Sequence, residues 1–156
     1  MDKSQYLVRA AAIAALYATV TYFLKPISYG PLQIRVSEAL TLLPILEGSA
    51  VPGLYIGCLV ANLLGGQGPW DIYGGSAITL IAAYMTSKTR NPYLGCIPPI
   101  LLNAFGVSYY LSIIYDLPYL ITALYIGIGQ IISVAGIGIP LYFAIKRSAL
   151  GKILKK

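Results

Sequence analysis

Five uninterrupted runs without a charged residue limit what this chain can fold into. They span residues 10–24, 48–70, 72–87, 91–115 and 117–145 of the 156. A soluble domain of this size buries only about 70% of its unfolded surface and could not hide so much apolar surface, whereas about 20 apolar residues in a helix cross a bilayer. We therefore expect an all-α integral membrane protein, with a single membrane domain over residues 1–156.

The basic residues predict the topology because they fall in three clusters. These are Lys3 with Arg9, Lys88 with Arg90, and Lys146 with Arg147, Lys152, Lys155 and Lys156. Lysine and arginine concentrate in short cytoplasmic loops. If all three clusters are cytoplasmic, an even number of spans must separate each from the next, so the short apolar run after Gln33 must be a span of its own.

The expected fold is a bundle of six transmembrane helices, with both termini cytoplasmic. The helices are expected at about residues 6–24, 36–46, 51–66, 71–87, 93–114 and 118–147. At 1.5 Å per residue the second helix covers only about 16 Å of an about 30 Å hydrocarbon layer. The loop before it must dip inward, where irregular backbone survives only when it is packed in protein or lines a cavity.

Nine residues on this topology outline one outward-facing cup. They are Gln33, Arg35 and Glu38 at the second helix, Asn62 on the third, Trp70, Asp71 and Tyr73 at the start of the fourth, and Asn103 and Gln130 deeper on the last two. Ionisable groups inside a membrane are costly and mark functional sites by default. We interpret these residues as a candidate substrate-binding site.

Each of these residues also has a purely structural interpretation. Arg35 and Glu38 lie three residues apart on one helix face and could neutralise each other. The three amides could each form an interhelical hydrogen bond, and Asp71 could cap a helix. Most of the 14 tyrosines fit an interfacial belt. The sequence leaves these alternatives open.

The first helix carries a stripe of small residues. Its members are Ala10, Ala14 and Ala18, flanked by Ala11 and Ala15. Small residues at every fourth position let another helix approach closely. We interpret the stripe as a docking face for a partner subunit, with packing inside the bundle as the alternative. Internal packing is the favoured interpretation for Gly53 and Gly57 on the third helix.

Missing residue types narrow the function. The chain has no histidine and 2 cysteines, which argues against histidine-based catalysis and a zinc or other transition-metal site. It has no GxxxxGK[ST] loop, so ATP and magnesium are expected in partner chains, and no cofactor or enzymatic activity in this one. The net charge of +6 reflects membrane topology rather than a nucleic-acid surface.

A binding cup on a chain that lacks an ATPase motif predicts the solute-recognising subunit of a larger transporter. Six helices in 156 residues are too few for the paired inverted repeats of many secondary transporters. The alternative is a self-sufficient homo-oligomeric carrier or channel for a small polar solute, with Glu38 or Asp71 as its proton or cation site. An intramembrane enzyme is disfavoured because no Asp, Ser or Lys cluster has catalytic spacing.

The stretches "ISYGPLQIRVSEALTLLP", "VPGLYIGCLVANLLGG" and "GIGQIIS" resemble the QueT family of substrate-binding (S) subunits of energy-coupling factor (ECF) transporters. The resemblance implies six helices in a prokaryotic plasma membrane and an outward-facing pocket covered by the loop before helix two. It also implies assembly with a transmembrane coupling subunit and two cytoplasmic ATPases, and vitamin-type uptake of a queuosine precursor, a deazaguanine base.

The polar residues suit that cargo. A guanine-like ring offers an N–H and an exocyclic amine to a carboxylate, and a carbonyl to Arg, Asn or Gln. Glu38 or Asp71 would accept from the first edge, and Asn62, Asn103 or Gln130 would donate to the second. Trp70 or Tyr73 could stack on the ring, a contact worth about 1–3 kcal/mol per base in nucleic-acid complexes.

Overall fold

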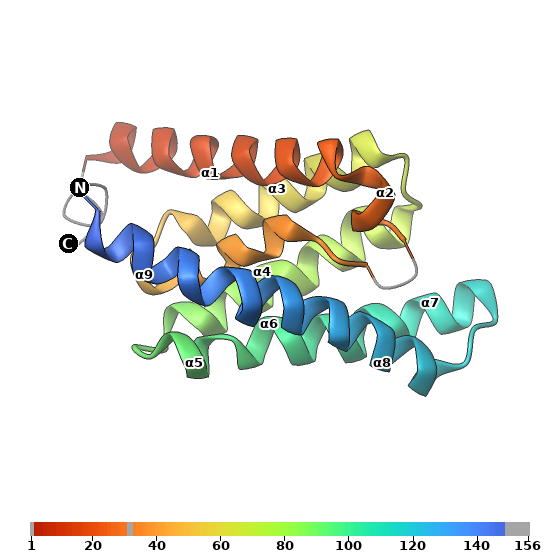
Figure 1. The fold of residues 1–156 in the computed structure, drawn as a ribbon. Coiled ribbons are helices and arrows are strands. Elements are labelled where there is room, and N and C mark those ends of the chain that lie inside the picture. The colour runs from red at the N-terminus through yellow and green to blue at the C-terminus, as the bar shows by residue number, and fades with distance from the viewer. Residues whose placement is uncertain (1, 31–32, 149–156) are drawn as a thin grey trace.

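The computed structural model describes residues 2–30 and 33–148, and within these ranges the chain forms helices and connecting loops without a strand (Figure 1). The helical segments in chain order are α1 (Lys3–Phe23), α2 (Lys25–Ser28), η1 (Val36–Ile45), α3 (Ala50–Gly65), η2 (Trp70–Gly75), α4 (Ser76–Ser87), α5 (Pro92–Gly95), α6 (Ile97–Leu102), η3 (Asn103–Val107), α7 (Ser108–Tyr115), α8 (Tyr119–Gln130), η4 (Ile131–Gly138) and α9 (Ile139–Arg147). Helices suit a bilayer because their backbone hydrogen bonds are satisfied within each segment.

Three of the helical stretches are long and apolar enough to cross a membrane. They are Lys3–Phe23, Pro92–Tyr115 and Tyr119–Arg147, while Val36–Ile45 and Ala50–Gly65 are apolar but shorter. The range predicted at 71–87 is helical from Trp70 to Ser87. All six predicted ranges are therefore occupied by helix, and the number of complete spans stays a prediction.

The described members of the basic clusters belong to one end of the bundle. α1 begins there, residues 88–91 turn there between α4 and α5, and α9 ends there with Lys146 and Arg147 (Figure 1). The further predicted residues Lys152, Lys155 and Lys156 lie outside the described residues. A shared end for the clusters is what the positive-inside rule requires of a bundle whose basic loops are all cytoplasmic.

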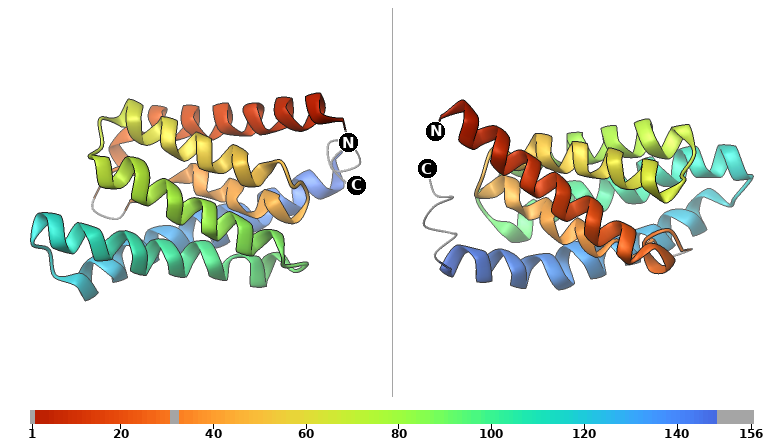
Figure 2. Two further views of the ribbon diagram at one scale, coloured as in Figure 1. Left: turned by 180° about the vertical axis from the view of Figure 1, so that it is seen from behind. Right: turned by 90° about the horizontal axis from the view of Figure 1, so that it is seen from above.

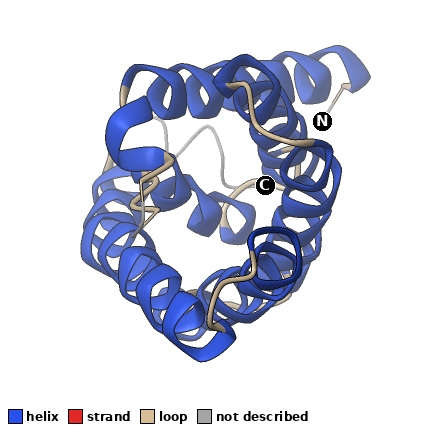
Figure 3. Ribbon diagram, turned by 90° about the vertical axis from the view of Figure 1, so that its right-hand side faces the viewer, coloured by secondary structure: helices blue, strands red, loops and turns tan. Residues whose placement is uncertain are grey.

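The short second helix is a 3₁₀-helix, η1, of 10 residues with Pro44 inside it. Because a 3₁₀-helix rises about 2.0 Å per residue, η1 covers about 20 Å instead of the about 16 Å expected for an α-helix. Every residue from Ser37 to Pro44 is buried. Contacts with α1, α3, α4, α5, η4 and α9 surround η1. Figure 3 shows the bundle end-on, with its helices arranged as a ring.

Three later helices contain π-helical turns, which the hydrophobic pattern did not predict. These turns are η2, η3 and η4. π-turns are rare and occur frequently at functional sites. Each adjoins a predicted site residue: Asp71 lies in η2, Asn103 begins η3, and Gln130 directly precedes η4.

Small residues bring α1 and α3 together (Figure 2). A Cβ atom at Gly53 would lie 2.8 Å from the Ala10 carbonyl oxygen, and one at Gly57 would lie 2.9 Å from the Ala14 carbonyl oxygen. The backbones approach closely because both helices lack bulk at these positions. The two glycines therefore pack inside the bundle.

The predicted docking stripe divides into a buried and an exposed half. Ala10, Ala14 and Ala18 are buried. They therefore do not form a docking face, because other helices of the bundle already cover them. Ala11 and Ala15 are exposed on α1, so the docking hypothesis remains with these two.

An ion pair ties the start of α1 to the loop between η1 and α3. The Arg9 guanidinium lies 2.5 Å from Glu47 Oε2, and the Glu47 side chain is 4% exposed. The Ser49 backbone N–H donates to Glu47 Oε1 at 3.2 Å. A buried carboxylate needs this cation, since an unpaired buried charge is strongly destabilising.

Candidate functional site

A polar cavity of about 320 Å³ lies at the end of the bundle opposite to the basic clusters. Residues from the loop after α2, the loop after α3, η2, α7 and α8 line it: Tyr29, Gly30, Gln33, Gln67, Asp71, Leu111, Tyr115, Leu117, Thr122 and Ile126. We call this the polar cavity. Of the predicted site residues, Gln33 and Asp71 line it.

Asp71 is held in a fixed position at the cavity wall. The Tyr110 hydroxyl donates to Asp71 Oδ1 at 2.9 Å, and Asn62 Nδ2 donates to the Asp71 backbone oxygen at 2.7 Å. A Cβ atom at Gly75 would lie 3.2 Å from the Tyr110 hydroxyl, so a glycine leaves room for this arrangement. The carboxylate makes no side-chain cap in η2, which argues against the capping interpretation.

Gln33 reaches the cavity from an unusual backbone conformation. Its φ of 43° lies in the left-handed region, which residues other than glycine adopt only infrequently. Such strain persists where the surrounding structure holds it, and it is found at ligand-binding positions. The loop before η1 therefore places this amide at the cavity through its backbone.

Arg35, Glu38 and Asn62 lie in the interior and do not line the polar cavity. The Tyr17 hydroxyl donates to Glu38 Oε1. Asn62 Nδ2 and an Arg35 guanidinium nitrogen both contact Cys58 Sγ, at 3.6 and 3.9 Å. These contacts connect the three predicted residues to α1 and α3.

Arg35 and Glu38 do not form a direct ion pair in this structure, and their mutual neutralisation across a longer distance stays open. Both residues belong to the described part of the chain, and they form no ion pair with each other there. Arg35 instead donates from Nε to the Ser28 carbonyl oxygen at 3.4 Å. Its guanidinium also lies 5.1 Å from the centre of the Tyr29 ring.

Asn103 and Gln130 pair with each other. Asn103 Nδ2 donates to Gln130 Oε1 at 3.3 Å, both side chains are buried, and neither lines the polar cavity. This is the interhelical hydrogen bond that the structural interpretation describes. A direct role of this pair in binding stays a prediction.

The predicted aromatic platform is in a different place. Trp70 and Tyr73 are 62% and 69% exposed and do not line the cavity. Within η2 the buried positions are Asp71 and Gly75. The aromatic side chains that do line the cavity are Tyr29 and Tyr115, and a stacking role of any of these residues stays a prediction.

Several site residues were missed from the sequence. They are Tyr29, Gln67, Tyr115 and Thr122 at the cavity, Tyr110 beside Asp71, and Tyr17 beside Glu38. Gly65 leaves room for Tyr29, because an added Cβ atom at Gly65 would lie 2.7 Å from the Tyr29 ring. This glycine is the sequence feature that could have indicated a bulky side chain packed nearby. The other tyrosines look like ordinary belt residues until the fold places them.

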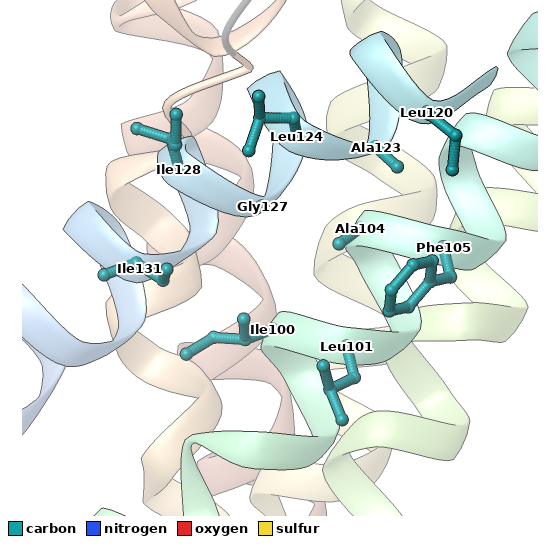
Figure 4. Close-up of a pocket in the computed structure, with 10 residues that line it drawn as sticks. All are labelled: Ile100, Leu101, Ala104, Phe105, Leu120, Ala123, Leu124, Gly127, Ile128 and Ile131. Carbon is teal, nitrogen blue, oxygen red and sulfur yellow. The ribbon is translucent and has the colours of Figure 1, made fainter.

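A second cavity, of about 340 Å³, lies between α6 with η3 and α8 with η4 (Figure 4). The side chains that line it are apolar, as the close-up of Ile100, Phe105 and Leu124 illustrates. None of these side chains can hydrogen-bond a polar solute. In the part of the chain that the structure describes, no group of three Asp, Glu, Cys or His residues could hold a metal ion.

Comparison with known proteins gives two matches. A family model described as QueT transporter matches residues 7–147. The Queuosine precursor transporter QueT of Lactococcus lactis subsp. cremoris (strain MG1363) is 40% identical over 65 residues, which are 40% of this chain and 38% of that relative. The similarity to this relative thus spans well under half of either protein. No solved structure matches the chain.

Proposed function

The chain belongs to the QueT transporter family, and we propose that it is the substrate-binding membrane subunit of an importer of the energy-coupling factor type. It captures a deazaguanine precursor of queuosine from outside the cell in the polar cavity. A transmembrane coupling subunit and two cytoplasmic ATPases, with their ATP and magnesium, then drive its delivery into the cell.

The observation that carries this proposal is the polar cavity with its fixed carboxylate. Asp71 is 4% exposed, and its contacts with Tyr110 and Asn62 hold it in place before any ligand arrives. Preorganised polar groups lower the cost of binding. A pocket with a few fixed polar groups among apolar and aromatic walls is typical of small-molecule sites.

The lining chemistry suits a flat, polar heterocycle. Tyr29 and Tyr115 offer aromatic faces, and Gln33, Gln67 and Thr122 offer both donors and acceptors. A stacked base gains about 1–3 kcal/mol from an aromatic side chain. The relative's name, Queuosine precursor transporter, supports a deazaguanine as the particular heterocycle.

The need for partners follows from what the chain lacks. Its sequence contains no GxxxxGK[ST] loop, so ATP-driven transport requires other chains. The exposed Ala11 and Ala15 on α1 are the proposed docking face for the coupling subunit. Small side chains permit close helix contact in lipid, where packing rather than the hydrophobic effect drives association.

Binding of 7-deazaguanine to the purified chain tests the proposal. We expect Asp71→Asn to weaken binding at least about tenfold, because a buried hydrogen bond to a charged group contributes about 1.5–3 kcal/mol. Asp116→Asn is the matched control, since Asp116 is exposed and its φ of 52° suits asparagine. Isothermal titration calorimetry measures both affinities.

Two outcomes would contradict the proposal. If the folded wild-type chain binds no deazaguanine, the substrate assignment is wrong. If the chain alone, reconstituted in liposomes, takes up the base robustly without ATP or partners, the self-sufficient carrier is the better description.

A labelling experiment tests the proposed topology of six spans. We expect Thr89→Cys to react with a membrane-impermeant maleimide only after the cells are opened, and Leu117→Cys to react in intact cells. The native Cys58 and Cys96 are buried, and Leu117 is exposed, so background labelling is low. Labelling of position 89 from outside would overturn the topology.

A further inference from the structure

We infer that the hydrogen-bonding edge of the ligand is read by a buried subsite formed by Arg35, Glu38 and Asn62, and not by Asp71. The inference rests on the proposed function, because it orients the proposed ligand class within the site. Sequence reasoning left Glu38 and Asp71 as equal candidates for this role. Three observations separate them.

The first observation is that two acceptor atoms in the buried subsite have no partner. Glu38 Oε2 and Asn62 Oδ1 make no hydrogen bond, although Glu38 is 1% and Asn62 0% exposed. The amide orientation of Asn62 is set, because its Nδ2 donates to the Asp71 carbonyl oxygen at 2.7 Å. Unpaired buried acceptors are costly, so both atoms are available to accept from the donors of a ligand.

The second observation is that Arg35 has donors to spare. A guanidinium carries five N–H donors, yet the contacts of Arg35 are long: 3.4 Å to the Ser28 oxygen and 3.9 Å to Cys58 Sγ. The Glu38 backbone N–H donates to the Arg35 carbonyl oxygen at 2.9 Å, so the two residues are held together at the start of η1. A cation with free donors thus lies near a carboxylate with a free oxygen.

The two free acceptors and the free guanidinium donors match the hydrogen-bonding edge of a guanine-type base. Such an edge presents a ring N–H and an exocyclic amine as donors, and a carbonyl oxygen as acceptor. Glu38 Oε2 and Asn62 Oδ1 would accept from the two donors, and Arg35 would donate to the carbonyl. A molecule that brings only donors, or only acceptors, would leave part of the subsite unsatisfied.

The third observation is that the polar cavity lacks the cationic half of this chemistry. Its lining residues, all in the described part of the chain, include no lysine or arginine. One Asp71 oxygen already accepts from Tyr110. Asp71 could therefore accept a donor but has no neighbouring cation to hold the carbonyl of the same edge.

The buried subsite lies directly behind the cavity wall. Tyr29 lines the cavity, and the Arg35 guanidinium lies over its ring, 5.1 Å from the ring centre. Asn62 donates to the backbone of Asp71, another wall residue. The base enters when the Tyr29 ring turns aside, and its five-membered ring then remains at the polar cavity, where the N–H of that ring donates to the second carboxylate oxygen of Asp71.

The test measures the affinity of each variant for two bases that differ in one hydrogen-bonding group. Wild-type chain should bind 7-deazaguanine at least about tenfold more tightly than 7-deazahypoxanthine, which lacks the exocyclic amine, because a charge-assisted hydrogen bond is lost. In Glu38→Gln this preference should fall below about threefold, since the missing contact is then no longer to a charged acceptor. In Asp71→Asn the preference should persist, even though both affinities fall.

Each outcome decides the matter. Collapse of the preference in Asp71→Asn but not in Glu38→Gln assigns the edge to Asp71 and overturns the inference, as does a wild-type chain that binds both bases equally. In those cases deazaguanine still binds, so the proposed function stands. Absence of binding to either base defeats the proposed function itself.

A second variant covers the case in which Glu38→Gln does not fold. Arg35→Lys should selectively weaken bases that carry the carbonyl. The base 2-amino-7-deazapurine lacks that oxygen and the ring N–H beside it, so the variant and the wild-type chain should bind it with affinities within about threefold of each other, while the variant loses at least about tenfold for 7-deazaguanine. Equal loss for both bases would count against a direct contact of Arg35 with the ligand.

Discussion

Replacing Ala15 with tryptophan is expected to abolish ATP-dependent uptake while leaving the ligand affinity of the isolated chain unchanged. Ala15 is exposed on α1, and the polar cavity has no lining residue from that helix. A tryptophan there would hold a helix of the proposed coupling subunit away from α1, and close packing is what drives helix association in lipid. Uptake by the reconstituted complex, co-purification of the coupling subunit and calorimetry on the isolated chain measure the three effects.

Ala14→Trp is the matched contrast to this variant. Ala14 is buried, and its carbonyl oxygen would lie 2.9 Å from a Cβ atom at Gly57. A bulky side chain must therefore push α1 away from α3, and overpacking of this kind costs about 1–3 kcal/mol or more. We expect a lower melting temperature and weaker ligand binding by the isolated chain. If Ala15→Trp behaved in the same way, with the coupling subunit still bound, the proposed docking face would be wrong.

Replacing Arg9 with leucine is expected to destabilise the folded chain by about 3–5 kcal/mol, because it leaves a buried carboxylate without its cation. The Glu47 side chain is 4% exposed, and Arg9 lies 2.5 Å from it. Leucine retains part of the apolar stem of arginine, so the loss reports mainly on the charge. Thermal melting in detergent and equilibrium unfolding measure the change.

Two further variants make that result specific. Arg90→Leu removes an exposed arginine from the loop between α4 and α5 and should leave the melting temperature nearly unchanged. Adding Glu47→Gln to Arg9→Leu should recover part of the lost stability, because a neutral amide costs less to bury than an unpaired charge. Failure of this rescue would show that Arg9 acts through other contacts.

The helical segments could be predicted because their signal is local. Long uncharged runs must form helices in a bilayer, and the basic clusters limit how these helices connect. The 3₁₀ form of η1 could not be predicted, since Leu40, Leu42 and Leu43 favour an α-helix. The packing of six other segments around η1 is a property of the whole fold, and no local pattern encodes it.

The candidate site was predicted in part for a similar reason. Rare polar residues in apolar runs, such as Asp71 and Asn62, stand out by composition alone. Tyr29 does not, because it is one of 14 tyrosines and only the fold separates a cavity wall from an interfacial belt. Alanines occupy several faces of α1. The sequence alone therefore does not show that Ala14 is on the buried face and Ala15 on the exposed face.

The enclosure of η1 has a consequence for biogenesis. A segment of 10 residues that carries Ser37, Glu38 and Thr41, all buried, has neither the length nor the apolarity to enter a bilayer alone. Two of its neighbours, η4 and α9, begin 86 and 94 residues after the end of η1. In the proposed six-span topology, we therefore expect η1 to enter the membrane only when the later helices can shelter it from lipid.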